Sequence, residues 1–247
     1  MTKYFGGLTA VGNLECQIDS GELVAVIGPN GSGKTTFFNL ITGMHRPSSG
    51  SLRFDGKEII GSKPYQVARH GIGRTFQKTT IFRRSTVLDN VIVGHRIHTR
   101  TGICGATLRT PATRKEEHEV TDKALEMLSF VGLLDKAHQI ADKLTQEAQK
   151  RLSIAVALAV RPKLLLLDEP TGGVNLEEIG GLIDLVKRIQ KAGTTICIIE
   201  HKMRMVMNIS DRIIVLNHGV KIAEGAPSEI ARNAEVIKAY LGPRYVA

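Results

Sequence analysis

The sequence predicts an α/β fold built around a parallel sheet, and three observations support this. Four apolar runs of four to six residues are bounded by glycine, aspartate or charged residues, which is typical of strands covered on both faces. Helical patterns, such as the spacing of Ile179, Leu182, Val186 and Ile189, separate the runs and favour parallel strands. A glycine-rich loop follows the first run. The expected strands are Leu23–Ile27, Leu164–Leu167, Thr194–Ile199 and Arg212–Leu216.

Two regions outside these runs have other patterns. Residues 1–19 and 50–72 are expected to form short antiparallel strands around turns. The stretch Ser85–Val160 lacks strand patterns and is expected to be a helical insertion. Its helices are expected over Lys115–Phe130 and Glu147–Val160.

The composition is that of an ordinary globular chain of 247 residues, with 42% apolar and 23% charged residues. No apolar run approaches the roughly 18 residues of a membrane-spanning helix. The cysteines Cys16, Cys104 and Cys197 have no metal-ligand spacing and form no even-numbered disulfide set. We therefore expect a soluble protein of a reducing compartment, and the sequence excludes a channel, a disulfide scaffold and a secreted domain.

The net charge of +9 favours an acidic partner. The charge does not distinguish among three kinds of acidic partner: nucleic acid, a lipid surface and a phosphorylated ligand. Aromatic residues make up only 4% and Trp is absent, which argues against a platform that stacks single-stranded bases.

A complete phosphate-loop motif follows the first strand. The pattern G-x-x-x-x-G-K-[ST] is matched by Gly28, Pro29, Asn30, Gly31, Ser32, Gly33, Lys34 and Thr35, with Thr36 next. Glycines let successive backbone N–H groups surround phosphate oxygens at a helix N-terminus. Lys34 is expected to reach the β- and γ-phosphates, and the Thr35 hydroxyl is expected to hold Mg²⁺. The strand before the motif and the helix after it make a chance glycine turn a poor alternative.

Two carboxylates end the second buried strand. Asp168 and Glu169 follow Leu164–Leu167 at the carboxyl edge of the sheet, where α/β sheets bind ligands. Asp168 is expected to hold Mg²⁺ through its water shell, and Glu169 is expected to polarise the attacking water. The alternative is that these residues only begin a helix. It is disfavoured because the same chain contains a complete phosphate-loop motif.

Together these residues resemble the nucleotide-binding subunits of ATP-binding cassette (ABC) transporters over nearly the whole chain. By this resemblance, Gln77 is the Q-loop residue that links Mg²⁺ to a helical subdomain, and His201 is the switch histidine that contacts the γ-phosphate. Phe5 stands where the family places a ring that stacks on adenine, although it could also be a core residue. The order and spacing of all these residues make the match specific.

The resemblance implies ATP and Mg²⁺ as cofactors and a P-loop NTPase fold of the ABC type. That fold has a RecA-like parallel-sheet core, an antiparallel β subdomain and a helical subdomain within a single ABC ATPase domain. The β subdomain is expected at about 1–20 and 50–72, the helical subdomain at about 85–160, the C-terminal tail at about 225–247, and the P-loop core over the remainder of 1–247.

Several features depart from the family pattern. The family signature L-S-G-G-Q corresponds here to Leu144, Thr145, Gln146, Glu147 and Ala148. Thr145 keeps the hydroxyl of the signature serine, but Gln146 and Glu147 replace the two glycines. The D-loop aspartate is replaced by Asn175. The chain also begins close to the adenine-stacking position, without the strand that the family usually has before it.

One cassette without a membrane segment implies separate integral membrane permease subunits and a second cassette, because the family's ATP sites form between two cassettes. A substrate-binding protein is a further expected partner, and no specific nucleic acid is expected. The expected location is cytoplasmic, peripheral on the inner face of the cell membrane. The insertion after Val87–Val91 and the tail Val236–Gly242 resemble the larger ATPase of branched-chain amino acid importers. Urea, amide and lipopolysaccharide transporters have near relatives of this type.

The insertion is also basic. Between Asn90 and Lys115 it contains Arg96, Arg100, Arg109 and Arg114 and no acidic residue. A solvated face is the simplest interpretation, and contact with anionic lipid is the alternative.

Two other classes of ABC protein remain open. A nucleic-acid-linked ATPase suits the positive charge, but the sequence shows neither the coiled-coil or zinc insertions of repair ATPases nor the second cassette of translation factors. A regulatory subunit that binds ATP without turnover suits the altered signature. Salt-sensitive DNA binding would favour the former, and ATP binding without hydrolysis beside a partner cassette would favour the latter.

The altered signature predicts a heterodimer. If Glu147 faced a partner's γ-phosphate at about 5 Å, with an effective dielectric constant of about 20, the like charges would cost about 3 kcal/mol. A homodimer would bear this cost at both sites and a heterodimer at one. This chain's phosphate loop and Glu169 are then expected to serve the faster site. The alternative is that the Glu147 side chain points away into solvent and both sites hydrolyse ATP at similar rates.

Overall fold

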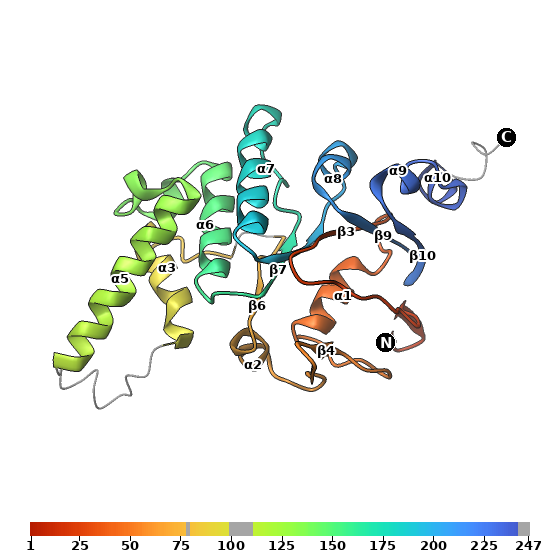
Figure 1. Ribbon diagram of the computed structural model, residues 1–247, viewed down its shortest axis with the longest axis horizontal. Coiled ribbons are helices and arrows are strands. Elements are labelled where there is room, and N and C mark those ends of the chain that lie inside the picture. Colours follow the sequence, from red (N-terminus) through yellow and green to blue (C-terminus); the bar gives the residue numbers. More distant parts are fainter. Residues whose placement is uncertain (78–79, 99–110, 242–247) are drawn as a thin grey trace. The chain divides into compact units, whose positions relative to one another are not determined.

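The computed structural model describes residues 1–77, 80–98 and 111–241 and divides the chain into two units. Unit 1 comprises Met1–Arg74, Lys163–Glu169 and Val186–Ala247, and unit 2 comprises Thr75–Pro162 and Pro170–Leu185. Figure 1 shows a sheet flanked by helices in unit 1 and a group of helices in unit 2. Helix α7 (Leu176–Lys191) belongs to both units.

The central sheet of unit 1 has six strands in the order β10-β9-β3-β8-β7-β6. They are β3 (Leu23–Ile27), β6 (Ile72–Arg74), β7 (Leu164–Asp168), β8 (Thr195–Ile199), β9 (Arg212–Asn217) and β10 (Val220–Gly225). All neighbours are parallel except β9 and β10, which form an antiparallel hairpin at one edge. The four strands expected from the sequence are present, and the predicted parallel α/β sheet is confirmed.

Both faces of this sheet are covered. Val24, Val26 and Leu166 pack on α1 (Lys34–Ile41), which contributes Phe37 and Phe38 to the same buried cluster. Figure 1 shows α1 on one side of the sheet and α8 (Met203–Ile209) on the other. Because alternate strand residues point to opposite faces, double coverage requires the continuous apolar runs seen in the sequence.

Short antiparallel strands form two separate two-stranded sheets. Strand β1 (Lys3–Phe5) pairs with β2 (Leu8–Val11), and β4 (Arg53–Phe54) pairs with β5 (Lys57–Glu58). The antiparallel strands expected within 1–19 are therefore present.

The prediction of antiparallel strands throughout 50–72 is wrong beyond β5. Pro64 begins the helix α2 (Pro64–Arg69), because its fixed φ and missing N–H suit the first helical turn. Ile72 then begins the parallel strand β6, which pairs with β7.

Unit 2 is helical, as the sequence predicts for Ser85–Val160. Its helices are α3 (Val87–His95), α5 (Pro111–Val131), α6 (Gln146–Leu158) and part of α7, with 3₁₀ turns at Arg96–His98, Leu134–Lys136 and Ala141–Lys143. Thr86 caps α3 by accepting the N–H of Asp89 at 3.0 Å. A Cβ at Gly94 would lie 2.7 Å from the Val156 carbonyl oxygen, so this glycine allows α3 to approach α6 closely.

The C-terminal part of unit 1 contains the β9–β10 hairpin, α9 (Pro227–Ile230) and α10 (Ala234–Leu241). Val236 of α10 is buried. Residues 242–247 of the expected tail lie outside the described residues, as do Arg100, Arg109 and Cys104. The two cysteines that are described, Cys16 and Cys197, are free.

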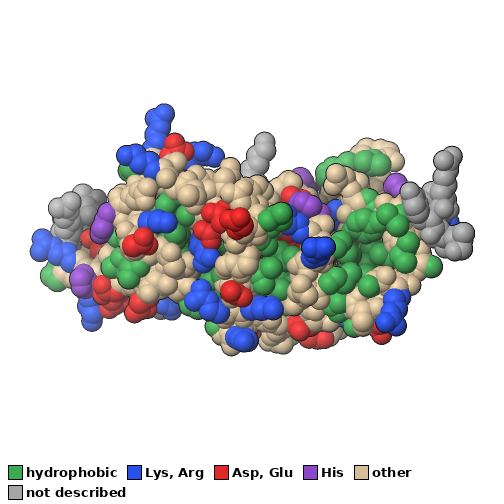
Figure 2. Space-filling model, turned by 90° about the horizontal axis from the view of Figure 1, so that it is seen from above, with side chains coloured by type: hydrophobic (Ala, Val, Ile, Leu, Met, Phe, Trp, Pro, Cys, Tyr) green, Lys and Arg blue, Asp and Glu red, His purple; other side chains and the backbone are tan. Residues whose placement is uncertain are grey.

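Charged side chains of both signs share the surface. Figure 2 shows Lys and Arg side chains spread among acidic ones over the face in view, rather than gathered into one patch. A basic stripe of the kind that binds nucleic acid is therefore not visible on that face. Within the described ranges, no helix has the length and apolar character needed to cross a bilayer.

Candidate functional site

The phosphate loop Gly28–Thr35 joins the end of β3 to the start of α1. Gly28 and Gly33 have φ angles of 150° and 100°. A Cβ at Gly28 would lie 2.0 Å from the Leu216 carbonyl oxygen, and one at Gly33 would lie 2.5 Å from that of Ala10. Both positions therefore need glycine for conformation and for space.

The turn between β9 and β10 supports this loop. The N–H of Gly219 donates to the Ser32 carbonyl at 3.1 Å, and the Gly219 carbonyl accepts the N–H of Gly12 at 2.8 Å. Tyr240 of α10 reaches the loop as well. Burial raises the pKa of Tyr240, and a hydrogen bond with the Gly28 backbone opposes that rise. Segments far apart in the sequence thus hold the loop.

Lys34 is the cation of the loop. Its ammonium donates to the carbonyl oxygens of Gly28 at 2.8 Å and Pro29 at 2.9 Å. Partial burial lowers the pKa of Lys34, and the negative charges of Glu169 and Asp168 oppose this effect. The two carboxylates therefore act electrostatically on the ammonium of the loop.

Asp168 ends β7 at the carboxyl edge of the sheet and is 2% exposed. Its Oδ2 atom forms an ion pair with Nη2 of Arg74 at 3.0 Å. Burial lowers the pKa of Arg74, and the hydrogen bond to Asp168 opposes that change. Arg74 belongs to none of the sequence motifs that predict the site. The sequence feature that could have identified it is a cation at the end of a short strand, three residues before Gln77.

Glu169 follows Asp168 with a φ of 47°, which is uncommon for glutamate and costs roughly 1–3 kcal/mol. Its N–H donates to the Ile199 carbonyl at 2.9 Å, which fixes it against the end of β8. His201 follows β8, and its Nδ1 lies 4.0 Å from Oε1 of Glu169. The structure therefore brings these two predicted residues together.

Glu200 is a second residue that sequence reasoning missed. It is 1% exposed, and its carboxylate accepts the N–H groups of His201 at 3.1 Å and Lys202 at 3.4 Å. These contacts hold the backbone that carries His201. The sequence feature that could have identified Glu200 is a charged residue directly after an apolar strand.

Phe5 lies in β1 and is 43% exposed, so the alternative that it is a core residue is wrong. Its ring meets the ring of His45 edge-on, with centroids 5.3 Å apart. The ammonium of Lys3 lies 5.0 Å from its centroid. An exposed ring of this kind is available for stacking.

Gln77 belongs to unit 2, whereas the phosphate loop belongs to unit 1. Its carbonyl oxygen accepts a hydrogen bond from Nζ of Lys150 at 3.2 Å. Lys150 is on α6 and is 5% exposed. Within unit 2, Lys150 thus ties the backbone of Gln77 to the helix that begins at the signature, a role that no sequence motif predicts.

The signature residues begin α6. Thr145 is its N-cap, and the hydroxyl accepts the N–H of Ala148 at 3.3 Å. Gln146 lies against Gly173, where a Cβ would be 3.2 Å from its Oε1 atom. Ala148 is 1% exposed, so its side chain is buried.

Glu147 forms an ion pair with Arg151, one turn further along α6. Arg151 also donates from Nη1 to the Val131 carbonyl at 3.0 Å. The charge of Glu147 is therefore compensated within unit 2. This ion pair opposes the repulsion expected between Glu147 and a partner's γ-phosphate, and the cost of about 3 kcal/mol stays a prediction for an uncompensated charge.

A family model described as "ABC transporter" matches residues 11–172. The chain belongs to the ABC transporter family. A second model, described as "Branched-chain amino acid ATP-binding cassette transporter", matches residues 220–242 of this ABC protein. That segment corresponds to β10, α9 and α10.

Relatives of this ABC protein match almost its entire length. It is 42% identical over 239 residues to the high-affinity branched-chain amino acid transport ATP-binding protein LivG of Salmonella typhimurium, covering 96% of this chain and 94% of LivG. It is 40% identical over 243 residues to the corresponding ATP-binding protein BraF of Pseudomonas aeruginosa, covering 98% and 95%. A solved ABC transporter cassette in its ADP conformation has a TM-score of 0.85 and 31% identity, covering 98% of this chain and 96% of that one.

The predicted family and the predicted ABC-type P-loop fold are confirmed by these matches. This ABC protein binds ATP and is an ATPase whose hydrolysis is coupled to transport. ABC ATPases of importers dimerise and work with membrane permease components.

Proposed function

We propose that this chain is the ATP-hydrolysing subunit of an importer for branched-chain amino acids. The observation that carries the proposal is the gathering of Lys34, Asp168, Glu169 and His201 at one edge of the unit 1 sheet. The near full-length similarity to LivG and BraF, together with the match over residues 220–242, supports the substrate class.

ATP is held mainly through its phosphates and adenine. The backbone of Gly28–Thr36 and the ammonium of Lys34 receive the phosphates, and the exposed ring of Phe5 stacks on adenine. Mg²⁺ fits the residues available: Thr35 and Asp168 offer oxygen ligands, and this ion prefers few protein ligands beside water and phosphate. When bound, Mg²⁺ supplies charge neutralisation at the phosphates.

Hydrolysis depends on residues that orient and activate water. Glu169 accepts a proton from the attacking water, and the hydrogen bond from its N–H to the Ile199 carbonyl holds its backbone at the end of β8. His201 stabilises the charge on the γ-phosphate. We propose that Gln77 is the Q-loop residue and that unit 2, to which it belongs, is the helical subdomain.

The proposed assembly contains two cassettes, permease subunits in the membrane and a substrate-binding protein. The chain is placed on the cytoplasmic face of the cell membrane. We favour a different cassette as partner, because Gln146 and Glu147 put side chains where the family signature has glycines. This chain's phosphate loop then faces the partner's signature at the faster site.

The first experiment changes the residues assigned to hydrolysis. In the assembled transporter, Glu169→Gln is expected to retain ATP binding and to lose most turnover, because the amide keeps the shape without the basicity. His201→Ala is expected to act similarly, and Asp168→Asn to weaken the dependence on Mg²⁺. Wild-type turnover in the Glu169→Gln transporter would remove Glu169 from its role, or place all turnover at the other site.

The second experiment tests the heterodimer. One catalytic glutamate is changed at a time, in this chain or in its partner cassette. Glu169→Gln is expected to abolish most hydrolysis, and the matching change in the partner to matter less. The reverse ranking would contradict the assignment of the faster site.

A further inference from the structure

Arg74 is a buried cation that none of the roles above explains. Its side chain is 6% exposed, at the end of β6. A charge in such a place requires partners, because desolvating it is costly. Its partners include residues from two parts of the nucleotide site, the end of β7 and the helix α1 with its C-cap.

One side of the guanidinium meets Asp168. The Nη2 atom lies 3.0 Å from Oδ2 of a carboxylate that is itself 2% exposed. Since a charge-assisted hydrogen bond is directional, this contact restricts how the Asp168 carboxylate can rotate.

The other side of the guanidinium meets α1. The Nη1 atom donates to Oδ1 of Asn39 at 2.6 Å and to the hydroxyl of Thr42 at 3.1 Å. The guanidinium carbon also lies 5.6 Å from the centre of the Phe38 ring. Asn39 and Phe38 belong to the helix that begins with Lys34 and Thr35, and Thr42 is the C-cap of that helix.

We propose that Arg74 is a positioning residue for the metal site of this ATPase. Its planar fork joins α1, which carries Thr35, to Asp168, and so fixes the distance between the two groups assigned to the metal. A lysine has the charge but cannot span both sides with a rigid geometry. The inference rests on the proposed function of Thr35 and Asp168 as Mg²⁺ ligands.

The test separates metal binding from nucleotide binding. Mn²⁺ is titrated into the protein with a non-hydrolysable ATP analogue and followed by electron paramagnetic resonance, and analogue affinity is measured separately in EDTA. Arg74→Met is expected to raise the half-saturating Mn²⁺ concentration about tenfold or more while changing the affinity in EDTA less than about twofold. The half-saturating Mn²⁺ concentration of Arg74→Lys is expected to lie between those of the wild-type protein and Arg74→Met.

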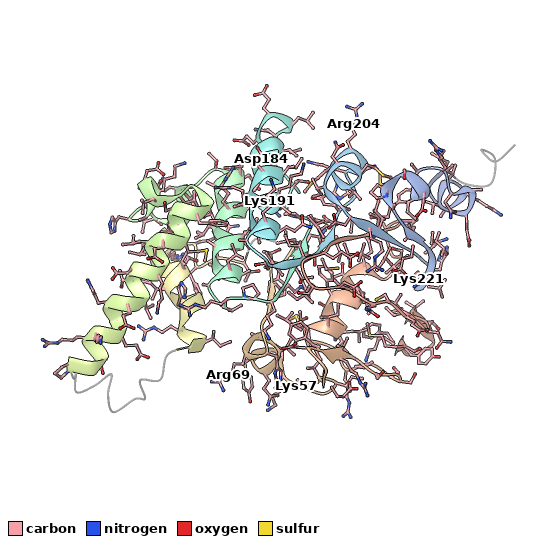
Figure 3. The ribbon with its side chains drawn as sticks, in the orientation of Figure 1. Lys57, Arg69, Asp184, Lys191, Arg204 and Lys221 are labelled. Atoms are coloured by element: carbon pink, nitrogen blue, oxygen red, sulfur yellow. The ribbon has the colours of Figure 1, made fainter. Side chains whose placement is uncertain are left out.

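Two further variants keep the test informative if Arg74→Met does not fold. Thr42→Val and Asn39→Leu keep Arg74 and Asp168, and each removes one of the two hydrogen bonds that connect Arg74 to α1 and its C-cap, so a smaller loss of Mn²⁺ affinity is expected in each. The matched control is Arg69→Met, because Arg69 is exposed on α2 and points away from the ribbon in Figure 3.

Each outcome has a distinct meaning. Unchanged Mn²⁺ affinity in folded Arg74 variants would overturn the inference, and so would equal losses of metal and analogue affinity. If the wild-type protein itself bound the analogue without any response to Mn²⁺, the proposed metal site would be wrong, and the role of Arg74 with it.

Discussion

Lys34 shows how a single side chain can be prepared for its ligand. Its ammonium already has two carbonyl acceptors within the phosphate loop, at 2.8 and 2.9 Å. In the proposed site, a phosphate oxygen would replace an existing acceptor, and the charged side chain would not need to be ordered from solvent. This reduces the conformational entropy lost on binding.

Replacing this residue should remove nucleotide binding. At 100 times its dissociation constant a ligand stabilises a protein by about 2.7 kcal/mol, which raises the melting temperature by several degrees. Lys34→Ala is expected to abolish the shift caused by MgATP in a thermal unfolding experiment. Lys57→Ala, at an exposed lysine of β5, should keep it. A full shift in Lys34→Ala would contradict the role of the loop.

The sequence identified residues by motif and missed residues that act through other residues. Lys34, Asp168 and Glu169 belong to patterns whose chemistry fixes residue type and spacing, so they could be found directly. Arg74 and Glu200 could not, because their roles depend on which strand ends become neighbours in the sheet. That neighbourhood is a property of the tertiary structure.

At the level of elements, two adjacent glycines of α7 have opposite surroundings. A Cβ at Gly180 would meet nothing within 4 Å, whereas one at Gly181 would lie 2.6 Å from Nη2 of Arg151. The arginine cannot simply move aside, because it also binds Glu147 and the Val131 carbonyl. Gly181 is therefore required by the packing of α6 against α7.

Alanine substitution at these positions should have effects of opposite sign. Gly180→Ala is expected to stabilise the protein by up to about 1 kcal/mol, since alanine favours the helix. Gly181→Ala is expected to destabilise it by roughly 1–2 kcal/mol, because the gain in helix propensity is smaller than the loss of the arginine contacts. Urea unfolding of both variants measures the difference. Equal stabilisation would show that Arg151 is free to move.

The β9–β10 turn offers a similar comparison in unit 1. Gly219 and Gly56 have φ angles of 81° and 74°, so alanine meets the same backbone strain at each. A Cβ at Gly219 would lie 2.9 Å from the Ala10 carbonyl oxygen, whereas Gly56 has open space.

The strain should therefore be separable from the effect on the phosphate loop. Gly56→Ala is expected to cost roughly 1 kcal/mol of stability and to leave ATP affinity unchanged. Gly219→Ala is expected to cost more and to weaken ATP binding several-fold, because it disturbs the hydrogen bond to Ser32. Titration with a fluorescent ATP analogue tests this. Equal affinities would show that the turn does not support the loop.

For the molecule as a whole, Arg212 connects the start of β9 to segments before and after it. Its guanidinium binds both carboxylate oxygens of Glu22, at 2.7 and 2.8 Å, and the Gln17 carbonyl at 2.7 Å. It also forms an ion pair with Glu224 of β10. The hydrogen bond from Arg212 is the main cause that lowers the pKa of Glu22.

This pair predicts a dependence of stability on pH. A carboxylate whose pKa is lower in the folded state stabilises the protein above its usual pKa of about 4.3 and loses that contribution as the pH falls through the folded value. Arg212→Met is expected to destabilise the protein at pH 7 by roughly 1 kcal/mol, a value kept small because the pair is partly exposed. The difference from wild type should close as the pH falls below about 4.

Thermal unfolding across this pH range measures the effect. Arg204→Met, at an exposed arginine of α8, is the control and should follow the wild-type profile. A constant difference between Arg212→Met and wild type at all pH values would rule out titration of Glu22 as its origin.

Four strands of the central sheet were predictable from the sequence because strands buried on both faces give continuous apolar runs, whereas the order of the strands was not. The stretch 50–72 was not, since two residues per strand carry too little pattern to separate β4 and β5 from the helix α2 that follows. The ion pair of Glu147 with Arg151 was also missed. The spacing of four residues permits it, but the sequence alone does not choose between this pair and an outward carboxylate.

The central claim is that ATP hydrolysis by this chain drives uptake of branched-chain amino acids. The most direct measurement is uptake of radiolabelled leucine into proteoliposomes that contain the assembled transporter, with MgATP enclosed and the substrate-binding protein outside. Wild-type transporter is expected to accumulate leucine while ATP is consumed, and Glu169→Gln is expected to lose both activities together. Uptake that persists in Glu169→Gln, or ATP consumption that does not respond to leucine and its binding protein, would contradict the account.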